Sequence, residues 1–106
     1  MRSRERFNWS YRVLTDIPDA MIGVYLFWYR PTGKCIYIGM AADQPIRNRL
    51  RQHWLGSHNE ALRLWMKAFG DELDLCYVQA EPNRVRTLER RLIRALSPEA
   101  NKQHKE

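Results

Sequence analysis

The stretch Gly-Val-Tyr-Leu-Phe-Trp-Tyr-Arg-Pro-Thr-Gly-Lys-Cys-Ile-Tyr-Ile-Gly, residues 23–39, decides the fold of this chain. β-branched and aromatic residues, which favour strands, dominate Val24–Tyr29 and Cys35–Ile38. Between these two runs, Pro31 and Gly33 stand where a tight turn needs a fixed φ and then a positive φ. The stretch therefore predicts a β-hairpin. Because both of its faces are apolar, we expect the hairpin to be covered on both sides.

Helical periodicity follows the hairpin in two neighbouring segments. Apolar residues recur every four positions from Ile46 to Trp54, and Gly56 ends this predicted helix. Ser57 and the glutamate three residues later have the spacing of a capping box. This pattern places Ser57 at the N-cap of a second helix, which extends to Phe69.

The order of the predicted elements defines the fold class. Strands are expected at residues 23–29, 34–40 and 73–80, and helices at 46–55, 58–69 and 83–96. The order β-β-α-α-β-α predicts an α+β fold, a small three-stranded antiparallel sheet flanked by helices. A chain of 106 residues suits a single domain. Residues 1–20 are expected to form an N-terminal extension, and residues 102–106 a flexible tail.

Composition excludes several classes of protein. The longest apolar run, Ala20–Tyr29, is too short to span a bilayer, which needs about 20 residues. The first residues are charged and no apolar segment follows them at once, so no signal peptide is expected. Cys35 and Cys76 fall in predicted strands, and we interpret them as small core residues rather than a disulfide or metal motif. A reducing cytoplasmic location is therefore expected.

The charge of the chain points to a polyanionic partner. The net charge is +6, and 14 of the 18 basic residues are arginine, whose guanidinium matches the geometry of phosphate. Arginines alternate with aromatic residues between Arg2 and Arg12, a pattern suited to contacts with phosphates and bases. The alternative is that Trp9 and Leu14 simply cover one side of the domain, on a short helix or arm that ends before Pro18.

Glu89 is the one carboxylate that breaks the pattern of the last helix. At about 100° per residue, it lies about 40° from the centre of the apolar stripe that runs from Val85 to Leu96. An inward carboxylate is costly unless it is paired or binds a metal. The sequence leaves two possible partners for the Glu89 carboxylate. One is a salt bridge with Arg49, and the other is a hard cation such as Mg²⁺, held with water and phosphate oxygens.

Four further polar side chains form a candidate set with Glu89. Arg49 and His53 are spaced i, i+4, so both project from one side of the first helix. Tyr25 and Tyr37 each stand two residues from a glycine at an end of the hairpin. Each of these residues alone is typical of ordinary packing. The sequence holds no zinc-ligand spacing, phosphate-binding glycine loop or serine nucleophile elbow, so this set is the candidate active site.

These residues carry a resemblance to a known family. Gly23-Val24-Tyr25 and Tyr37-Ile38-Gly39, separated by eleven residues, resemble the two triplets of the GIY-YIG nuclease superfamily. Arg-Leu-Arg-Gln-His at 49–53 resembles the helix that carries the family's catalytic arginine, and Thr-Leu-Glu-Arg-Arg-Leu-Ile around Glu89 resembles its metal-binding segment. Pro98-Glu99-Ala100-Asn101 is similar to the family's Pro-x-x-Asn. The resemblance runs from Gly23 to Asn101 and leaves residues 1–20 outside.

The resemblance implies a metal-dependent endonuclease that hydrolyses phosphodiester bonds in DNA. By position, Tyr25 and Tyr37 would hold or deprotonate the attacking water, with Tyr25 preferred as the general base or its relay. Arg49 would stabilise the charge on the phosphorane-like transition state. His53 would orient the nucleophile or relay its proton. Glu89 would bind one Mg²⁺ or Mn²⁺ ion, a Lewis acid on the scissile phosphate and the leaving 3′ oxygen.

The remaining implications concern binding and the alternative function. Asn101 would support the phosphate site or the shape of the C-terminal turn. We expect Arg47, Arg51 and Arg90 to contact nucleic acid. Because the domain has little surface for reading base sequence, it would act on a DNA structure, on single strands, or with a partner protein that directs it to its target. Many family members carry Lys or Arg directly after the second triplet, where this chain has Met40. The alternative is therefore a catalytically weak or inactive nucleic-acid-binding module on the same fold.

Overall fold

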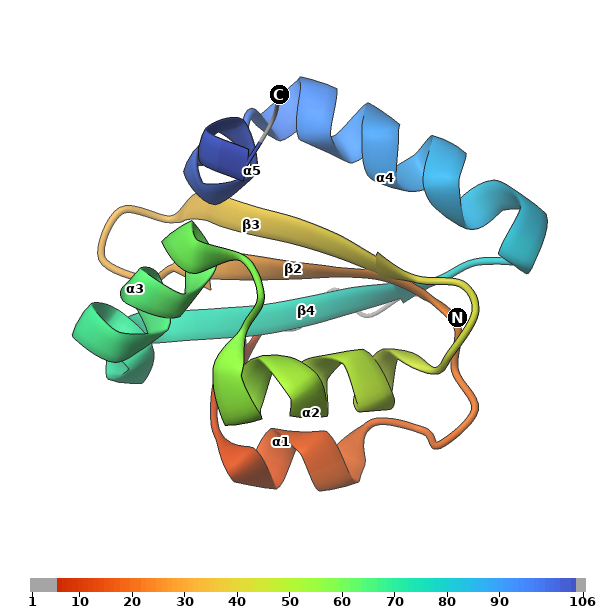
Figure 1. The fold of residues 1–106 in the computed structure, drawn as a ribbon, viewed down its shortest axis with the longest axis horizontal. Coiled ribbons are helices and arrows are strands. Elements are labelled where there is room, and N and C mark those ends of the chain that lie inside the picture. The colour runs from red at the N-terminus through yellow and green to blue at the C-terminus, as the bar shows by residue number, and fades with distance from the viewer. Residues whose placement is uncertain (1–5, 105–106) are drawn as a thin grey trace.

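The computed structural model describes residues 6–104, which form one sheet with helices packed around it (Figure 1). In chain order the elements are β1 (Phe7–Asn8), α1 (Tyr11–Asp16), β2 (Gly23–Tyr29), β3 (Lys34–Ala41), α2 (Ile46–Gly56), α3 (Glu60–Phe69), a 3₁₀ turn (Gly70–Glu72), β4 (Leu73–Gln79), α4 (Pro82–Leu96) and α5 (Glu99–His104). Of the predicted tail, residues 102–104 belong to α5, whereas 105–106 lie outside the described residues. Arg2 and Arg4 of the extension also lie outside them.

The sheet contains four antiparallel strands in the order β1-β4-β2-β3. The predicted α+β class is confirmed, but the predicted number of three strands is wrong. The additional strand is β1, in which Phe7 pairs with Leu75 and Asn8 with Asp74. Two residues are too few to show the alternation from which a strand is predicted. Part of the predicted N-terminal extension therefore belongs to the sheet.

The predicted hairpin is present as β2 and β3, and it contains one irregularity. Tyr37 pairs with Phe27, whereas Cys35 pairs with Trp28, so Ile36 is the extra residue of a β-bulge. Without the bulge, strict alternation would place Ile36 and Tyr37 on opposite faces of the sheet. With it, both side chains pack into the same core cluster.

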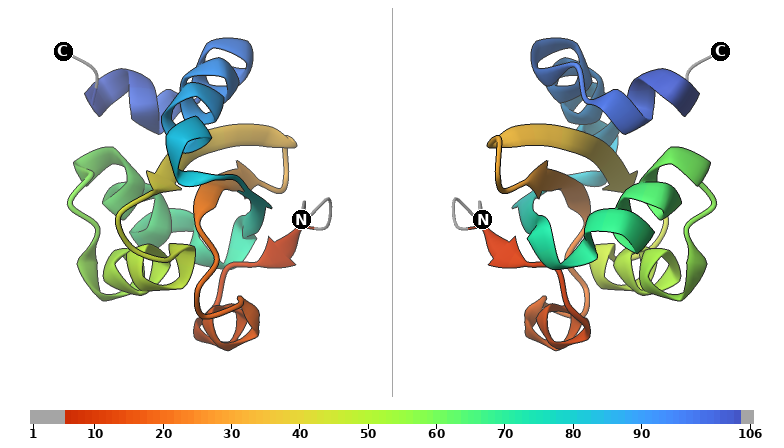
Figure 2. Two further views of the ribbon diagram at one scale, coloured as in Figure 1. Left: turned by 90° about the vertical axis from the view of Figure 1, so that its right-hand side faces the viewer. Right: turned by 90° about the vertical axis from the view of Figure 1, so that its left-hand side faces the viewer.

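Two hydrophobic cores lie on opposite sides of the sheet. The larger one packs under α1, α2, α3 and α5, which Figure 2 shows grouped around the strands. Trp9 is 7% exposed and Leu14 is 1% exposed, and both belong to this core. The interpretation that these two residues cover one side of the domain is therefore confirmed.

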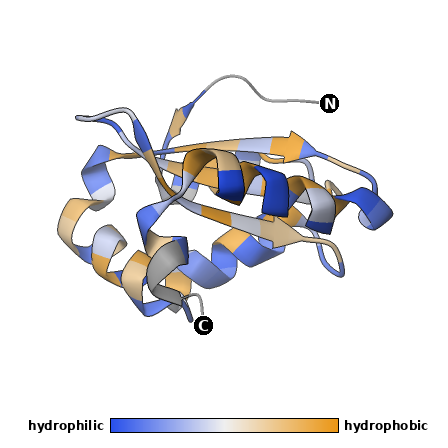
Figure 3. Cartoon of the chain, turned by 90° about the horizontal axis from the view of Figure 1, so that it is seen from above, coloured by the Kyte–Doolittle hydropathy of each residue, from blue (hydrophilic) through white to orange (hydrophobic). Residues whose placement is uncertain are grey.

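The smaller core lies between the sheet and α4. It includes Val85 from the helix and both cysteines, Cys35 and Cys76, which are buried and free, as predicted. Met40 packs against this core as well. Seen from above, the helix that lies over the strands carries both hydrophilic and hydrophobic residues along its length (Figure 3). None of the helices in the described part of the chain has the length and apolar character needed to cross a membrane.

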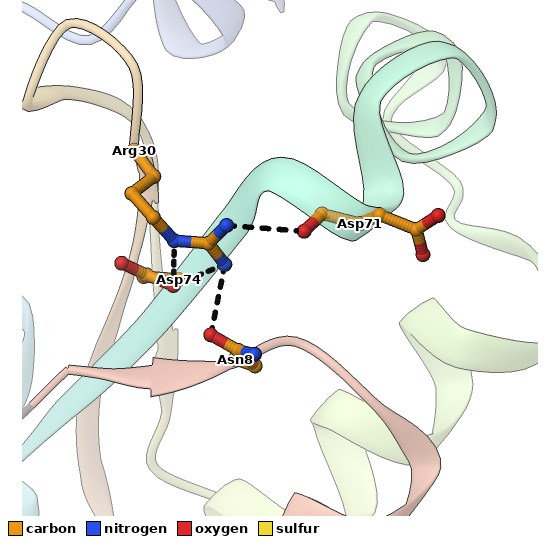
Figure 4. Close-up of polar contacts among 4 residues, drawn as sticks. All are labelled: Asn8, Arg30, Asp71 and Asp74. Carbon is orange, nitrogen blue, oxygen red and sulfur yellow. Dashed lines mark hydrogen bonds and ion pairs between the residues drawn. The ribbon is translucent and has the colours of Figure 1, made fainter.

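Arg30 ties the turn end of the hairpin to the two strands beyond β2 (Figure 4). Its Nε and Nη2 donate to Asp74 Oδ1 on β4 at 3.1 and 2.8 Å. Nη2 also donates to Asn8 Oδ1 on β1 at 2.8 Å, and Nη1 donates to the carbonyl oxygen of Asp71 at 3.3 Å. One guanidinium thus joins β2, β4 and the short β1, which has few contacts of its own.

Candidate active site

The centre of the site is a hydrogen bond between Tyr25 on β2 and His53 on α2. Tyr25 Oη and His53 Nε2 lie 2.7 Å apart. The side chain of Tyr25 is fully buried, and His53 is 8% exposed. The ring of Tyr37 on β3 packs beside both, with its centroid 6.4 Å from that of Tyr25 and 5.7 Å from that of His53. Three of the predicted site residues, from three elements, therefore form one cluster.

The glycines of the two triplets stand where a side chain would collide with this arrangement. Gly39 pairs directly with Tyr25 across the hairpin, and the phenol ring lies over it. A Cβ added at Gly39 would lie 2.4 Å from both Cζ and Oη of Tyr25. A Cβ at Gly23 would lie 2.0 Å from the carbonyl oxygen of Val78 on β4. Both glycines are thus required by close approach, and Gly39 sets the position of the Tyr25 hydroxyl.

Arg49 lies one helical turn before His53 on α2 and is half-buried. Its guanidinium is close enough to both tyrosines to oppose the effect that burial has on the pKa of each hydroxyl. Arg49 Nε is buried and has no hydrogen-bond partner among the described residues. An unpaired buried donor is costly, and it marks a place where a ligand can supply the missing acceptor. A phosphate oxygen has the charge and geometry to do so.

Glu89 is half-buried on α4, as expected from its position near the apolar stripe. Burial raises the pKa of Glu89, and the nearby guanidiniums of Arg86, Arg90 and Arg49 act against this rise. In the described part of the chain the ion pairs are Arg30–Asp74 and Arg47–Asp19, so Glu89 forms none with Arg49. The salt bridge considered from the sequence is absent, and the carboxylate is left available for another partner.

Burial sets the protonation states of the ring cluster. It raises the pKa of the Tyr25 hydroxyl far above its usual value, and it also raises the pKa of Tyr37. Burial lowers the pKa of His53 to about 4, and the charges of Arg49 and His58 act in the same direction. At neutral pH both phenols are therefore protonated and the imidazole is neutral. The Tyr25 hydroxyl and Nε2 of a neutral imidazole therefore face each other at the centre of the site.

Ser57 is not the N-cap of α3, so the role predicted for it from the sequence is wrong. The N-cap of α3 is Asn59, whose Oδ1 accepts from the main-chain N of Leu62 at 2.9 Å. Ser57 instead faces the site, with Oγ 2.8 Å from His53 Nδ1. Asn59 is an equally good N-cap residue, and it caps α3 without the glutamate of a capping box. The available signal was a small hydroxyl residue four positions after a histidine, just beyond the end of α2.

Asn101 on α5 contacts the hairpin, not the ring cluster. Its Oδ1 accepts from the main-chain N of Ile38 at 2.8 Å, and its Nδ2 donates to the carbonyl oxygen of Ile38 at 2.9 Å. Ile38 stands between Tyr37 and Gly39 on β3, so the amide holds the strand at the point where it enters the site.

The three arginines expected to contact nucleic acid lie in different surroundings. Arg47 is directed to α1, where its Nε donates to the carbonyl oxygen of Leu14 at 2.8 Å, and it forms an ion pair with Asp19. Arg51 on α2 and Arg90 on α4 are exposed. The structure therefore leaves Arg51 and Arg90 open to solvent, while Arg47 joins α2 to the N-terminal part of the chain.

The site can hold a divalent cation only through the side chains that could serve as its ligands. Among residues 6–104 no group of three or more His, Cys, Asp and Glu side chains is arranged to hold a metal ion. Glu89 alone supplies a half-buried carboxylate without an ion-pair partner in the described structure. One carboxylate suits Mg²⁺, which keeps several waters and takes substrate phosphate oxygens as ligands. The residues present thus fit a cation that is completed by water and substrate.

Comparison with known proteins identifies the family to which this chain belongs. The sequence matches the family described as the GIY-YIG catalytic domain over residues 21–104, and the chain belongs to this family. The resemblance stated from the sequence is confirmed. Solved structures similar to the chain include two of the GIY-YIG N-terminal endonuclease domain of UvrC from Thermotoga maritima, each a tyrosine-to-phenylalanine point mutant bound to its catalytic divalent cation. Sequence identities are 26% and 25%, each with a TM-score of 0.56, and each match covers 86% of this chain and 96% of the other. No curated protein sequence in the comparison matches the chain.

Proposed function

We propose that this chain is an endonuclease that hydrolyses phosphodiester bonds in DNA with the help of a divalent cation. The observation that carries the proposal is the hydrogen bond between buried Tyr25 and neutral His53, with Arg49 and Glu89 acting on the same tyrosine hydroxyl. Phosphodiester hydrolysis needs a proton acceptor, a positive charge beside the phosphate and a carboxylate that can bind a metal ion. His53, the guanidinium of Arg49 and Glu89 would supply these three groups.

The comparisons support the same proposal at the level of the family. GIY-YIG domains are nuclease domains, and the similar UvrC domains are endonuclease domains bound to a catalytic divalent cation. We assign the cation of this chain, Mg²⁺ or Mn²⁺, to Glu89. When bound there, it would supply Lewis-acid activation of the scissile phosphate and of the leaving 3′ oxygen.

The residues of the chain move the proton of the attacking water. The water gives a proton to Tyr25 Oη while the Tyr25 hydroxyl proton passes to His53 Nε2, across the 2.7 Å hydrogen bond. The two transfers occur together, because burial raises the pKa of Tyr25 and disfavours a free tyrosinate. The hydroxyl of Tyr37, from the neighbouring strand, orients the water.

Arg49 stabilises the charge that develops on the phosphate. Its buried Nε gains the acceptor that it lacks in the free protein. Because the donor is already in place, no reorganisation is needed as the negative charge grows. A single donor of this kind is typically worth about 3 kcal/mol of transition-state stabilisation.

The test is cleavage of end-labelled single- and double-stranded DNA by the purified full chain, with Mg²⁺, with Mn²⁺ and with a chelator. We expect cleavage that requires the cation and that Glu89→Gln and Arg49→Ala abolish. Glu60→Gln, an exposed glutamate on α3, and Arg94→Ala, an exposed arginine on α4, are the matched controls and should retain activity.

Cleavage that survives both Glu89→Gln and Arg49→Ala would contradict the site assignment. Binding of DNA without cleavage under either metal would instead favour the nucleic-acid-binding module. One observation is compatible with that second function: Met40, which follows the second triplet, packs into the core under α4 and supplies no charge to the site.

A further inference from the structure

Ser57 is a buried hydroxyl beside the site that has no part in the mechanism above. It lies in the loop between α2 and α3 and is 4% exposed. Its Oγ is 2.8 Å from His53 Nδ1 and also accepts from the main-chain N of Asn59 at 3.2 Å. Tyr25, His53 and Ser57 therefore form a continuous hydrogen-bonded chain, which ends in the loop that follows α2.

The surroundings of Tyr25 limit the acceptors that are available to its hydroxyl proton. Before substrate and the attacking water are bound, a buried hydroxyl finds its acceptor among neighbouring protein groups. The guanidinium of Arg49, which also acts on this hydroxyl, has only donors. His53 Nε2 lies 2.7 Å from Tyr25 Oη, and the hydroxyl of Tyr37 is the other neighbouring group that can hydrogen-bond to it. We take the 2.7 Å contact as the one that receives the Tyr25 proton, so that Nε2 carries no proton of its own.

The tautomer of His53 follows from the direction of that hydrogen bond. With its pKa lowered to about 4 by burial, the ring is neutral at neutral pH and holds one proton. Because Nε2 accepts from Tyr25, this proton is on Nδ1, and Nδ1 donates to Ser57 Oγ. Ser57 Oγ then accepts from both His53 and Asn59, and its own proton is directed to the pocket that Ser57 lines, where water can accept it.

We propose that Ser57 is a positioning residue that fixes His53 as the Nδ1–H tautomer and so keeps Nε2 ready for the proton of Tyr25. The proposal rests on the proposed function, because only proton transfer from Tyr25 gives this tautomer a role in the reaction. As the Tyr25 proton reaches Nε2, the ring becomes an imidazolium in which both N–H groups donate, Nε2 to Tyr25 and Nδ1 to Ser57. Ser57 thus also stabilises the charge that forms on the ring.

Removal of the Ser57 hydroxyl leaves His53 Nδ1 with no partner in this loop. The ring is then free to take the other tautomer, in which Nε2–H faces Tyr25 as a donor and cannot receive its proton. The pocket lined by Ser57, His53, Trp9 and Trp54 has a volume of about 330 Å³, so the extra methyl group of a threonine can be accommodated. Ser57→Ala and Ser57→Thr therefore separate loss of the hydroxyl from a change of size.

The first test is the nitrogen NMR spectrum of the His53 ring in the ¹⁵N-labelled full chain, with His53→Gln used to identify its signals. The two ring nitrogens report which of them carries the proton. We expect the Nδ1–H tautomer in the wild type and in Ser57→Thr, and a mixture or the Nε2–H tautomer in Ser57→Ala. An Nε2–H ring in the wild type, or an unchanged tautomer in Ser57→Ala, would overturn the proposal.

The second test is steady-state cleavage of DNA by the same variants. We expect kcat to fall about 10- to 100-fold in Ser57→Ala, with KM unchanged, and to recover in Ser57→Thr. Ser10→Ala, at the N-cap of α1 where the side chain makes no capping hydrogen bond, is the matched control and should behave as wild type. A Ser57→Ala variant with wild-type kcat would show that the hydroxyl has no role in positioning.

The two measurements distinguish failure of the inference from failure of the proposed function. If the wild type shows the expected tautomer but no variant or condition gives cleavage, the proposed function fails while the hydrogen-bonded chain stands. Should Ser57→Ala fold poorly, Ser57→Thr still decides the matter, because a folded Ser57→Thr that loses the Nδ1–H tautomer contradicts the assignment.

Discussion

Asn101 holds Ile38 by both of its main-chain polar groups, with Oδ1 2.8 Å from the amide nitrogen and Nδ2 2.9 Å from the carbonyl oxygen. β3 is an edge strand, so these two groups have no neighbouring strand to pair with. The side-chain amide of Asn101 takes the place of that strand at one residue. Because Tyr37 and Gly39 flank Ile38, this contact fixes the position of β3 relative to α5 at the site.

Replacement of Asn101 by alanine should destabilise the fold and loosen β3 locally. The substitution removes two hydrogen bonds and leaves a half-buried N–H and C=O without a partner, which typically costs about 2–3 kcal/mol. The measurement is urea denaturation, together with hydrogen exchange of the Ile38 amide. Asn83→Ala, an exposed asparagine in the first turn of α4, is the control and should change stability little. An unprotected Ile38 amide in the wild type would contradict the role given to Asn101.

Replacement of Gly39 by alanine should displace Tyr25. The new Cβ would stand 2.4 Å from Tyr25 Oη, so either the ring or the strand has to move. We expect a loss of stability of about 1–3 kcal/mol, as for an overpacked core. We also expect a fall in kcat of about 100-fold, because the hydroxyl is misplaced. Gly70→Ala, where the Cβ meets nothing within 4 Å, should leave both quantities near wild type. Wild-type kcat in Gly39→Ala would show that the position of the hydroxyl is not critical.

Stability should fall as the pH is lowered from about 6.5 to about 4, because of His53. Burial lowers the pKa of His53 from 6.5 to about 4, so the unfolded chain binds the proton more readily than the folded one. Its contribution is fully present above pH 6.5 and is lost as the pH falls through the folded value, by about 3 kcal/mol in total. Denaturant titrations between pH 4 and pH 8 measure this change. In His53→Gln the free energy of unfolding should no longer lose this contribution between pH 6.5 and pH 4. An unchanged pH dependence in His53→Gln would show that another group causes it.

The salt dependence of DNA binding should separate the three arginines. Arg51 and Arg90 are exposed, so each phosphate interaction that Arg51→Ala or Arg90→Ala removes should reduce the slope of log K against log salt by about 0.9 on duplex DNA. Arg47→Ala should leave this slope unchanged and lower stability instead, because its guanidinium is bound to Leu14 and Asp19. Fluorescence anisotropy with labelled DNA at several salt concentrations provides the measurement. A reduced slope in Arg47→Ala alone would reverse these assignments.

Much of the fold could be predicted from the sequence because its strongest signals are local. The alternation of apolar residues and the turn residues located β2 and β3, and the apolar period of four located α2 over Ile46–Gly56. The i, i+4 spacing of Arg49 and His53 predicted that both project from one side of α2, and in the structure both lie near Tyr25. The inward position of Glu89 followed from the helical angle alone.

The rest depends on contacts between distant segments or on competition between local patterns. β1 has two residues, and it exists because β4 and Arg30 offer it partners far along the chain. Ser57 and Asn59 are both good helix caps, and packing of the loop against His53 decides which of them takes the role. The clamp of Asn101 on Ile38 joins residues that no periodic pattern connects.

The β-bulge at Ile36 has a consequence for how this hairpin can change. It divides the hairpin into an outer part, which contains the turn, and an inner part, in which Tyr25 is paired with Gly39. Because a residue added to one strand is taken up at the bulge, the outer part can vary in length while the inner pairing keeps its register. The turn at residues 30–33 is therefore a natural point of insertion. A segment that recognises a particular target can be acquired there, in evolution or by design, without moving the site.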